Sequence, residues 1–159
     1  MQEDATTRDK LVTTAARLFR QQGYHGTGLA AILAGAGVPQ GSLYHPVPQG
    51  KADLARAAVD LTAAELVRIT GEAFAGAKNW QGGAATFWHK MARLFDILDS
   101  ADACPISGLM FEGPEAGDFR AHAAAAFERI IAAAAAEGVR LGLPRAAARD
   151  AAETLLMSF

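Results

Sequence analysis

The sequence is poor in cysteine, in strand-favouring runs and in long uncharged apolar segments. A single cysteine, Cys104, excludes an internal disulfide framework. Val, Ile, Thr and Tyr never alternate over a long run, so we expect helices and no sheet. Glu128 and Arg129 interrupt the alanine-rich run at 121–136, which leaves no stretch of roughly 18 uncharged apolar residues for a membrane span. Met1 is followed by acidic and polar residues instead of a secretion signal, so we expect a cytoplasmic protein with no membrane partner.

The sequence also lacks the patterns of a metal centre or a phosphate-binding loop. Its four histidines, at positions 25, 45, 89 and 122, do not have the paired spacing typical of metal ligands. Neither standard form of the glycine-rich phosphate loop is present. We therefore expect no metal and no cofactor, and the protein is predicted not to be an enzyme.

The chain does contain many alanines and apolar residues at helical spacing, and 51% of its residues are hydrophobic. Capping residues, glycines and prolines divide it into successive predicted helices. These are 7–23, capped by Thr6 or Thr7; a short helix capped by Thr27 and ending around 35–37; 39–45, with Pro39 in its first turn; 51–74, or to Gly76; 84–98, after Gly82 and Gly83; 106–111; 118–138; and 144–159. The expected buried face of the helix at 118–138 is Phe119, Ala123, Phe127, Ile130, Ile131 and Ala134. The last helix is still apolar at Phe159, which predicts truncation at the C-terminus.

The net charge of −2 is unevenly divided along the chain. Up to Arg56 there are six Lys or Arg against four Asp or Glu, giving +2, whereas the remainder has nine against thirteen, giving −4. Phosphate contacts dominate affinity for DNA. A basic N-terminal end joined to an acidic body is therefore what a sensor with a DNA-binding head needs.

The stretch from Gly26 to Lys51 has the layout of a helix-turn-helix that reads DNA, with two short helices and a glycine-bearing turn in about two dozen residues. The start of its second helix is formed by Gln40, Gly41 and Ser42. Gln pairs bidentately with adenine, Ser donates or accepts, and Gly lets the backbone approach the bases.

Four further residues of this stretch are placed to bind phosphates, which fix the register of a protein on DNA without reading sequence: Thr27, Tyr44, His45 and Lys51. Each also has a simpler interpretation. Thr27 is suited to plain helix capping, Tyr44 to closing a core, and His45 to solvent exposure. Lys51 is equally typical of a solvated surface lysine.

These residues resemble the TetR family of one-component regulators. The resemblance runs from Leu11–Tyr24 through Gly26–Leu29 and Ala36–His45 to Gly50-Lys51. Within the family the chain is most similar to the LmrA/YxaF-like subgroup, because of Gly50-Lys51 and the segment Cys104-Pro105-Ile106. The specific motifs cover about the first 56 residues, and beyond them the likeness is one of helix pattern.

The resemblance implies an all-α homodimer with a three-helix DNA-binding head, residues 1–50, and a helical ligand-binding and dimerisation body, residues 51–159. It implies a repressor that binds a double-stranded DNA operator, is released by a small apolar or amphipathic effector, and dimerises through its last two helices. The DNA surface implied by position is Thr27, Gly28, Gln40, Gly41, Ser42, Tyr44, His45 and Lys51. The chain departs from the family at Pro46-Val47, where an aromatic residue usually packs beneath the recognition helix, and this predicts a looser head or weaker DNA binding.

A stripe of aromatic and methionine residues in the body is either ordinary helical core or the lining of a ligand cavity, since such cavities are mainly apolar. The candidates for ligand contact are Phe74, Trp80, Phe87, Trp88, Met91, Phe95, Met110 and Phe111, with His89, Glu112 and His122 as candidate polar anchors. The rival function is a helical small-molecule-binding protein whose head has lost DNA affinity through Pro46 and Val47. An enzyme with its active site in the body cavity is a more distant alternative.

Overall fold

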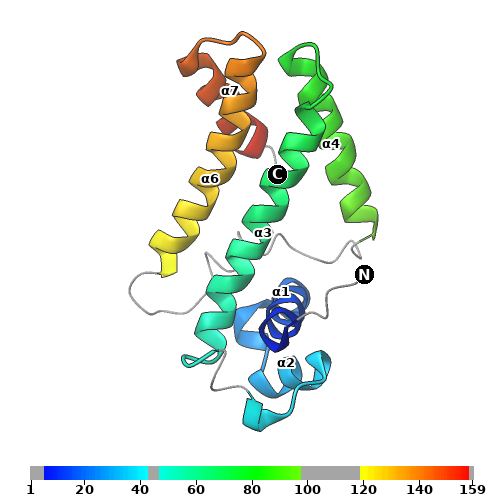
Figure 1. Ribbon diagram of the computed structural model, residues 1–159, viewed down its shortest axis with the longest axis vertical. Coiled ribbons are helices and arrows are strands. Elements are labelled where there is room, and N and C mark those ends of the chain that lie inside the picture. The colour runs from blue at the N-terminus through cyan, green and yellow to red at the C-terminus, as the bar shows by residue number, and fades with distance from the viewer. Residues whose placement is uncertain (1–5, 43–46, 98–118, 158–159) are drawn as a thin grey trace. The chain divides into compact units, whose positions relative to one another are not determined.

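Helices make up all the regular structure of the described residues, which are 6–42, 47–97 and 119–157 of the computed structural model (Figure 1). In chain order they are α1 Thr7–Gly26, α2 Leu29–Ala36, the 3₁₀ helix η1 Gln40–Ser42, α3 Lys51–Phe74, α4 Trp80–Ile97, α6 Phe119–Arg140 and α7 Arg145–Met157. The predicted all-α class is confirmed for these ranges. The helix expected at 106–111 lies outside them, as do Tyr44, His45, Cys104, Met110, Phe111, Glu112 and Phe159. None of the described helices is long and apolar enough to cross a membrane.

The described residues form two compact units. The first contains 6–42, 47–62 and 119–124, and the second contains 63–97 and 125–157. The division falls within α3, because Leu54, Ala55 and Ala58 in its first turns are wholly buried in the first unit. The functional boundary after residue 50 stays a prediction.

Helix α1 begins where the sequence predicts, with Thr6 as its N-cap. The Asp9 backbone N–H donates to Thr6 Oγ1 at 3.2 Å, and the Thr6 backbone N–H donates to Asp9 Oδ2 at 3.1 Å. This capping box gives partners to two amide groups at the start of the helix. Hydrogen bonds from Thr6 lower the pKa of the Asp9 carboxyl. Gly23 marks the end of the regular helix, as predicted, because its backbone leaves the helical conformation there (φ 72°, ψ 171°), and one further turn beyond this kink extends α1 to Gly26.

The core of the first unit contains hydrophobic side chains from α1, α2, the segment before α3, the first turns of α3 and the start of α6. Those with at most 1% exposure are Leu11, Ala15, Ile32, Val47, Leu54, Ala55, Ala58, Val59, Phe119 and Ala123. Val47 is therefore a core residue of this unit, at the position where the resemblance leads us to expect a larger aromatic side chain. Also in this unit, Nε2 of the half-buried His122 lies 3.2 Å from Asp60 Oδ1.

In the second unit, α4 begins at Trp80, so the prediction that it starts after Gly82 and Gly83 is wrong. Asn79 accounts for the earlier start. Its Oδ1 accepts the Gly82 N–H at 2.9 Å, and its backbone oxygen accepts the Gly83 N–H at 3.3 Å. Gly83 also leaves room for Phe74, because a Cβ placed there would lie only 2.1 Å from Phe74 Cδ1.

Helix α6 buries a face that differs in part from the predicted one. Its buried hydrophobic residues are Phe119, Ala123, Ala126, Ile130 and Ala134. Phe127 and Ile131, which the sequence places on this face, are half-buried at its edge, and Ala126 takes the buried position instead. From Phe119 to Ala134 these buried residues follow one another at intervals of four, three, four and four residues. Residues at such intervals lie on one face of a helix, which is why Ala126 is buried and Phe127 is not.

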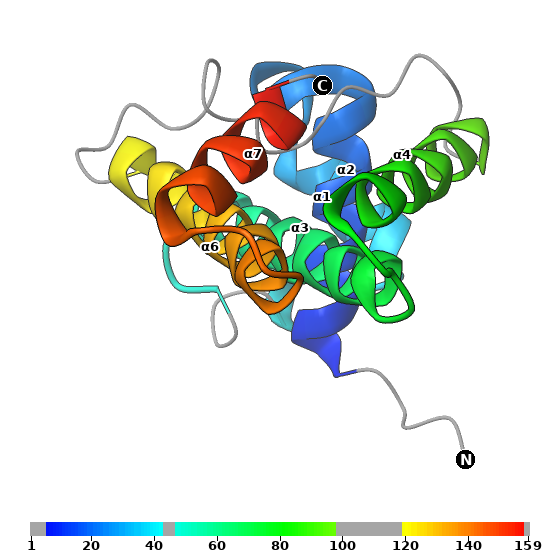
Figure 2. The same ribbon diagram turned by 90° about the horizontal axis from the view of Figure 1, so that it is seen from above.

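Helices α6 and α7 run side by side in both ribbon views (Figure 2). A Cβ at Gly138 of α6 would lie 3.0 Å from the Cβ of Ala148 of α7, so small residues permit the close approach. Arg140 of α6 also donates from Nη2 to the carbonyl oxygen of Phe74 at 2.7 Å, which caps the end of α3.

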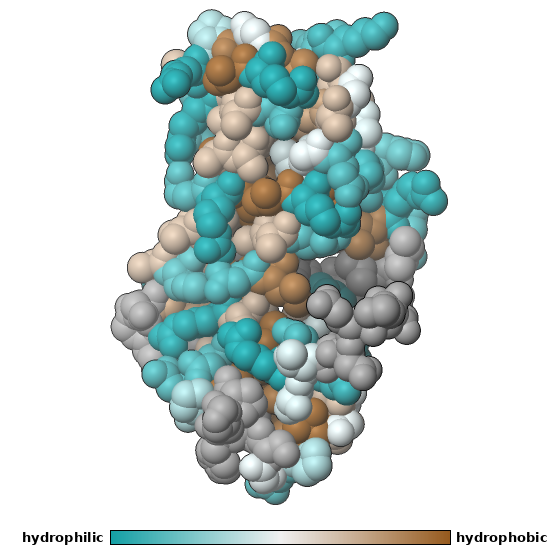
Figure 3. Space-filling view, in the orientation of Figure 1, coloured by the Kyte–Doolittle hydropathy of each residue, from teal (hydrophilic) through white to brown (hydrophobic). Residues whose placement is uncertain are grey.

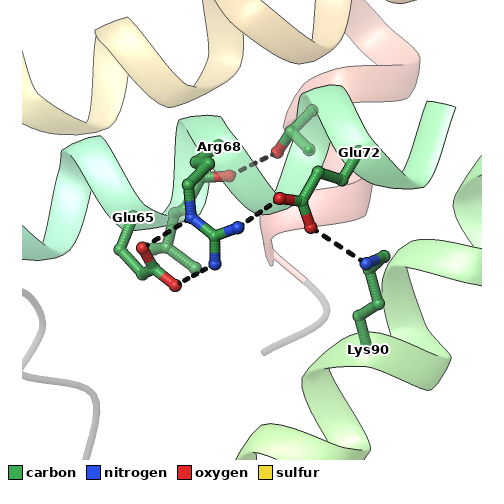
Figure 4. A network of polar contacts seen from close by, with 6 residues as sticks. Glu65, Arg68, Glu72 and Lys90 are labelled. Carbon is green, nitrogen blue, oxygen red and sulfur yellow. Dashed lines mark hydrogen bonds and ion pairs between the residues drawn. The ribbon is translucent and has the colours of Figure 1, made fainter. Parts of the chain in front are cut away.

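Ion pairs connect the exposed faces of α3 and α4 (Figure 4). Arg68 donates to Glu65 at 2.5 and 2.9 Å and also pairs with Glu72, to which Lys90 of α4 donates at 3.0 Å. The bond from Arg68 lowers the pKa of Glu65, and the bond from Lys90 is the main cause that lowers the pKa of Glu72. These pairs contribute little to stability because water screens them.

Hydrophobic residues appear as separate groups among hydrophilic ones on the face drawn in Figure 3. Within 6–42, 47–97 and 119–157, the large hydrophobic side chains that stay exposed are Leu61, Phe95, Val139 and Met157. Val139 and Met157 belong to α6 and α7, respectively.

Candidate nucleic-acid interface

The turn between α1 and α2 is built around Thr27, whose side chain is 0% exposed. Its hydroxyl faces back into α1, with Oγ1 2.8 Å from the carbonyl oxygen of Gly23 and 3.2 Å from that of Leu18. The prediction that Thr27 caps α2 is wrong, because the N-cap is Gly28 and no side chain makes a capping hydrogen bond there. The hydroxyl has a single proton, and the shorter distance assigns it to the carbonyl of Gly23, at the kink where the regular helix ends.

Gly28 is exposed and has open space around it, since a Cβ placed there would meet no other atom within 4 Å. Its carbonyl oxygen accepts the N–H groups of Ala31 and Ile32 at 3.1 and 3.2 Å, which starts α2. A helix start that presents backbone N–H groups is suited to an anionic partner such as phosphate. Gly28 has no side chain, so it contributes to such a site through its backbone alone.

Gln40 and Gly41 are exposed in η1, and Ser42 is the last residue of the same turn. The second helix of the predicted helix-turn-helix thus begins as a 3₁₀ turn in the part that the structure describes. A Cβ at Gly41 would meet nothing within 4 Å, so a partner has free access to this backbone. Tyr44 and His45, the predicted end of the helix, lie outside the described residues.

Lys51, the first residue of α3, has its ammonium group on the backbone of the α1–α2 turn. Nζ lies 3.0 Å from the carbonyl oxygen of Tyr24 and 3.1 Å from that of Thr27. The structure therefore brings Thr27 and Lys51 together behind the turn, whereas Gly28, Gln40 and Gly41 face solvent. Sequence reasoning missed this contact because it spans more than twenty residues, and no local pattern signals it.

The residues predicted to contact a ligand differ widely in exposure. Phe74, Phe87 and Met91 are buried, Trp80 and Trp88 are half-buried, and Phe95 is 36% exposed. The ring centroids of Phe74 and Trp80 are 4.9 Å apart, and those of Phe87 and Trp88 are 5.9 Å apart. Phe74 and Trp80 thus form one aromatic pair of the second unit, and their part in ligand binding stays a prediction.

Of the candidate polar anchors, His89 is exposed on α4 and His122 pairs with Asp60 in the first unit. The sequence did not point to a surface hollow of about 310 Å³ in the first unit, lined by Asp9, Lys10, Thr13, Thr14, Gly35 and Ala36. None of the predicted ligand-binding residues that the structure describes lines it.

Comparison with known proteins identifies a family for the head. The sequence profile of "Bacterial regulatory proteins, tetR family" matches residues 11–58. The chain is 37% identical over 106 residues to an uncharacterized HTH-type transcriptional regulator, YxaF, of Bacillus subtilis, covering 67% of this chain and 56% of YxaF. It is 31% identical over the same length to the HTH-type transcriptional regulator LmrA of Bacillus subtilis, again covering 67% and 56%.

A third relative matches over a longer region. The chain is 30% identical over 146 residues to an uncharacterized HTH-type transcriptional regulator of Mycobacterium tuberculosis, covering 86% of this chain and 72% of that protein. Against YxaF and LmrA, however, the chain spans only a little over half of the relative's length, 56%.

Solved structures confirm the fold, an N-terminal helix-turn-helix followed by a helical body. A TetR transcriptional regulator from Legionella pneumophila superposes with a TM-score of 0.79 at 15% identity, covering 99% of this chain and 84% of that one. The regulatory protein TetR from Rhodobacter sphaeroides gives 0.77 at 22% identity, covering 96% and 88%. These identities are low, so the likeness shows the fold alone.

Proposed function

The chain belongs to the TetR family of bacterial regulatory proteins, with similarity to YxaF and LmrA, and from this we propose that it is a DNA-binding transcriptional regulator. The observation that carries the proposal is that η1, exposed at Gln40 and Gly41, lies inside the matched region 11–58. A helix-turn-helix reads the major groove through the start of its second helix. The turn η1 occupies that place in the sequence.

The proposed DNA surface consists of Gly28, Gln40, Gly41, Ser42, Tyr44 and His45. In this proposal Gln40 reads a base edge, and the N–H groups at the start of α2 beside Gly28 bind a phosphate. Thr27 supports this surface from inside the protein, because its hydroxyl is bound to α1.

We also propose that the protein acts as a homodimer joined through α6 and α7. Val139 of α6 is 42% exposed and Met157 of α7 is 85% exposed, and burial of such side chains favours association. A dimer of this kind binds an operator with two half-sites, about one helical turn or a multiple of it apart.

For regulation, we propose a repressor that a small apolar or amphipathic effector releases from the operator. The effector would bind among the aromatic residues of the second unit, which include Trp80 and Trp88. Binding shifts the population toward a state with weaker operator affinity, by no more than the preference of the effector for that state. Helix α3 connects the two units and is the proposed route of this shift.

Selection of duplexes from a random pool by the purified protein tests the function. We expect enrichment of a two-fold symmetric sequence. Gln40→Ala should change base preference at one position of each half-site by about tenfold, since a bidentate contact is lost. Gln81→Ala makes the same chemical change on an exposed residue of α4 and should leave the preference unchanged. No enrichment even at low salt would contradict the proposal and favour a helical small-molecule-binding protein that has lost DNA binding.

Both tryptophans of the chain lie on α4, so their fluorescence reports on the proposed effector site. An apolar extract of the host cells, added to the complex with the selected duplex, should release the duplex and change this fluorescence together. Release without a fluorescence change would contradict an effector site beside Trp80 and Trp88.

A further inference from the structure

The ammonium group of Lys51 is held by three contacts within the first unit. Nζ donates to the carbonyl oxygens of Tyr24 and Thr27 at 3.0 and 3.1 Å. It also lies 4.2 Å from the centroid of the Tyr24 ring, which is the distance of a cation–π contact. The Tyr24 ring in turn packs against Phe19, with centroids 5.6 Å apart. Lys51 is thus bound to the end of α1 and to a ring that α1 itself supports.

These contacts engage most of the ammonium group. A lysine has three N–H donors and no acceptor, and two donors of Lys51 go to backbone carbonyls. The aromatic ring attracts the charge on a further side. A DNA phosphate would compete with these partners for the ammonium group, and the Tyr24 carbonyl would then keep only the Thr27 N–H, at 3.3 Å. The geometry favours a role inside the protein over a phosphate contact.

The start of α3, to which Lys51 belongs, is itself well fixed. The Gly50 N–H donates to the carbonyl oxygen of Val47 at 2.9 Å, and the Gln49 N–H donates to Asp53 Oδ2 at 2.8 Å. Thr27, at the other end of the contact, directly precedes the N-cap of α2. Lys51 therefore joins an ordered start of α3 to the point from which α2 begins.

We propose that Lys51 is a positioning residue of the DNA-binding surface, whose ammonium group fastens the α1–α2 turn to the first turn of α3 and binds no phosphate. Its effect on DNA affinity rests on the function proposed above, and it replaces the phosphate contact expected from the sequence. Without this contact, the turn gains conformational freedom that must be lost again when the head binds DNA. Binding then weakens while the number of phosphates contacted stays the same.

The test compares Lys51→Met with Lys78→Met, which removes the same charge from an exposed lysine of the second unit. Binding to one labelled duplex, selected by the wild-type protein, is measured by fluorescence anisotropy over a salt series. We expect Lys51→Met to bind about tenfold more weakly at every salt concentration, with an unchanged slope of log K against log salt. Lys51→Arg, which keeps the charge and donors, should recover part of the affinity, and Lys78→Met should match the wild type.

A decrease of the slope by about 0.9 in Lys51→Met would show a lost phosphate contact and overturn the inference. Wild-type affinity in Lys51→Met, or no recovery in Lys51→Arg, would overturn it as well.

Nuclear magnetic resonance of the DNA-free protein separates this inference from the proposed function. The Tyr24 ring signals and the Gly28 amide signal should shift in Lys51→Met and stay in place in Lys78→Met. If the wild-type protein binds no duplex, the proposed function fails and these signals alone decide whether Lys51 positions the turn. Unchanged Tyr24 and Gly28 signals would overturn that role.

Discussion

Replacing Gly83 by alanine places a methyl group where the ring of Phe74 lies. The added Cβ would be 2.1 Å from Phe74 Cδ1, 2.3 Å from Cε1 and 2.8 Å from Cγ. Phe74 is 0% exposed and its ring lies 4.9 Å from that of Trp80, so the ring cannot move away without displacing its neighbours. Overpacking of this kind costs about 1–3 kcal/mol, which exceeds the gain of at most about 1 kcal/mol from Gly→Ala in a helix. We expect the free energy of unfolding to fall by about 1–2 kcal/mol.

Gly82→Ala is the matched control, because it is the same change one residue earlier in α4. Its Cβ would lie 3.4 Å from Asn79 Oδ1 at an exposed position, so stability should stay the same or rise by up to about 1 kcal/mol. Urea unfolding followed by the fluorescence of Trp80 and Trp88 measures both variants. Adding Phe74→Leu to Gly83→Ala should cost less than the two single changes together. Equal stability of the two alanine variants would refute the packing argument.

Three further predictions concern stability. Thr27→Val should lower the free energy of unfolding by about 1–3 kcal/mol, because the Gly23 carbonyl loses its hydroxyl donor and this polar group stays in a buried place. Thr27→Ser keeps the hydroxyl and should cost less in the same urea titration, and the reverse order would contradict this role. Arg140→Met removes the donor to the Phe74 carbonyl and should therefore lower the melting temperature. Arg149→Met, the control, breaks only exposed pairs with Glu128 and Glu153 and should lower the melting temperature less. Equal melting temperatures of the two variants would argue against the cap on α3. The pKa values of Glu65 and Glu72 are lowered from 4.5. The stability that these carboxylates contribute is therefore present above pH 4.5 and is lost as the pH falls through the lowered values. Arg68→Met should reduce this acid-induced loss of stability, measured as the urea midpoint over a series of acid pH values.

Much of the helical architecture was predictable from local signals. Thr6 with Asp9 marks the start of α1, Gly37 ends α2 in the left-handed conformation, and Pro144 precedes α7. Capping and chain termination act over a few residues, so the sequence alone contains them.

The contacts of Thr27 and Lys51 were not predictable in the same way. A threonine between two helices can serve the helix before it or the helix after it, and here the buried hydroxyl serves α1. Lys51 reaches carbonyls on a segment far back in the sequence, which only the packed head brings near. The start of α4 was missed for a related reason, because Gly83 is inside the helix to make room for Phe74.

The most direct test of the account is hydrogen–deuterium exchange of the protein with and without its selected duplex. If the start of α2 and η1 form the reading surface, the amides of residues 28–42 should become protected on binding, in step with duplex occupancy. Protection confined to other parts of the chain, with residues 28–42 unchanged in the saturated complex, would contradict the central claim.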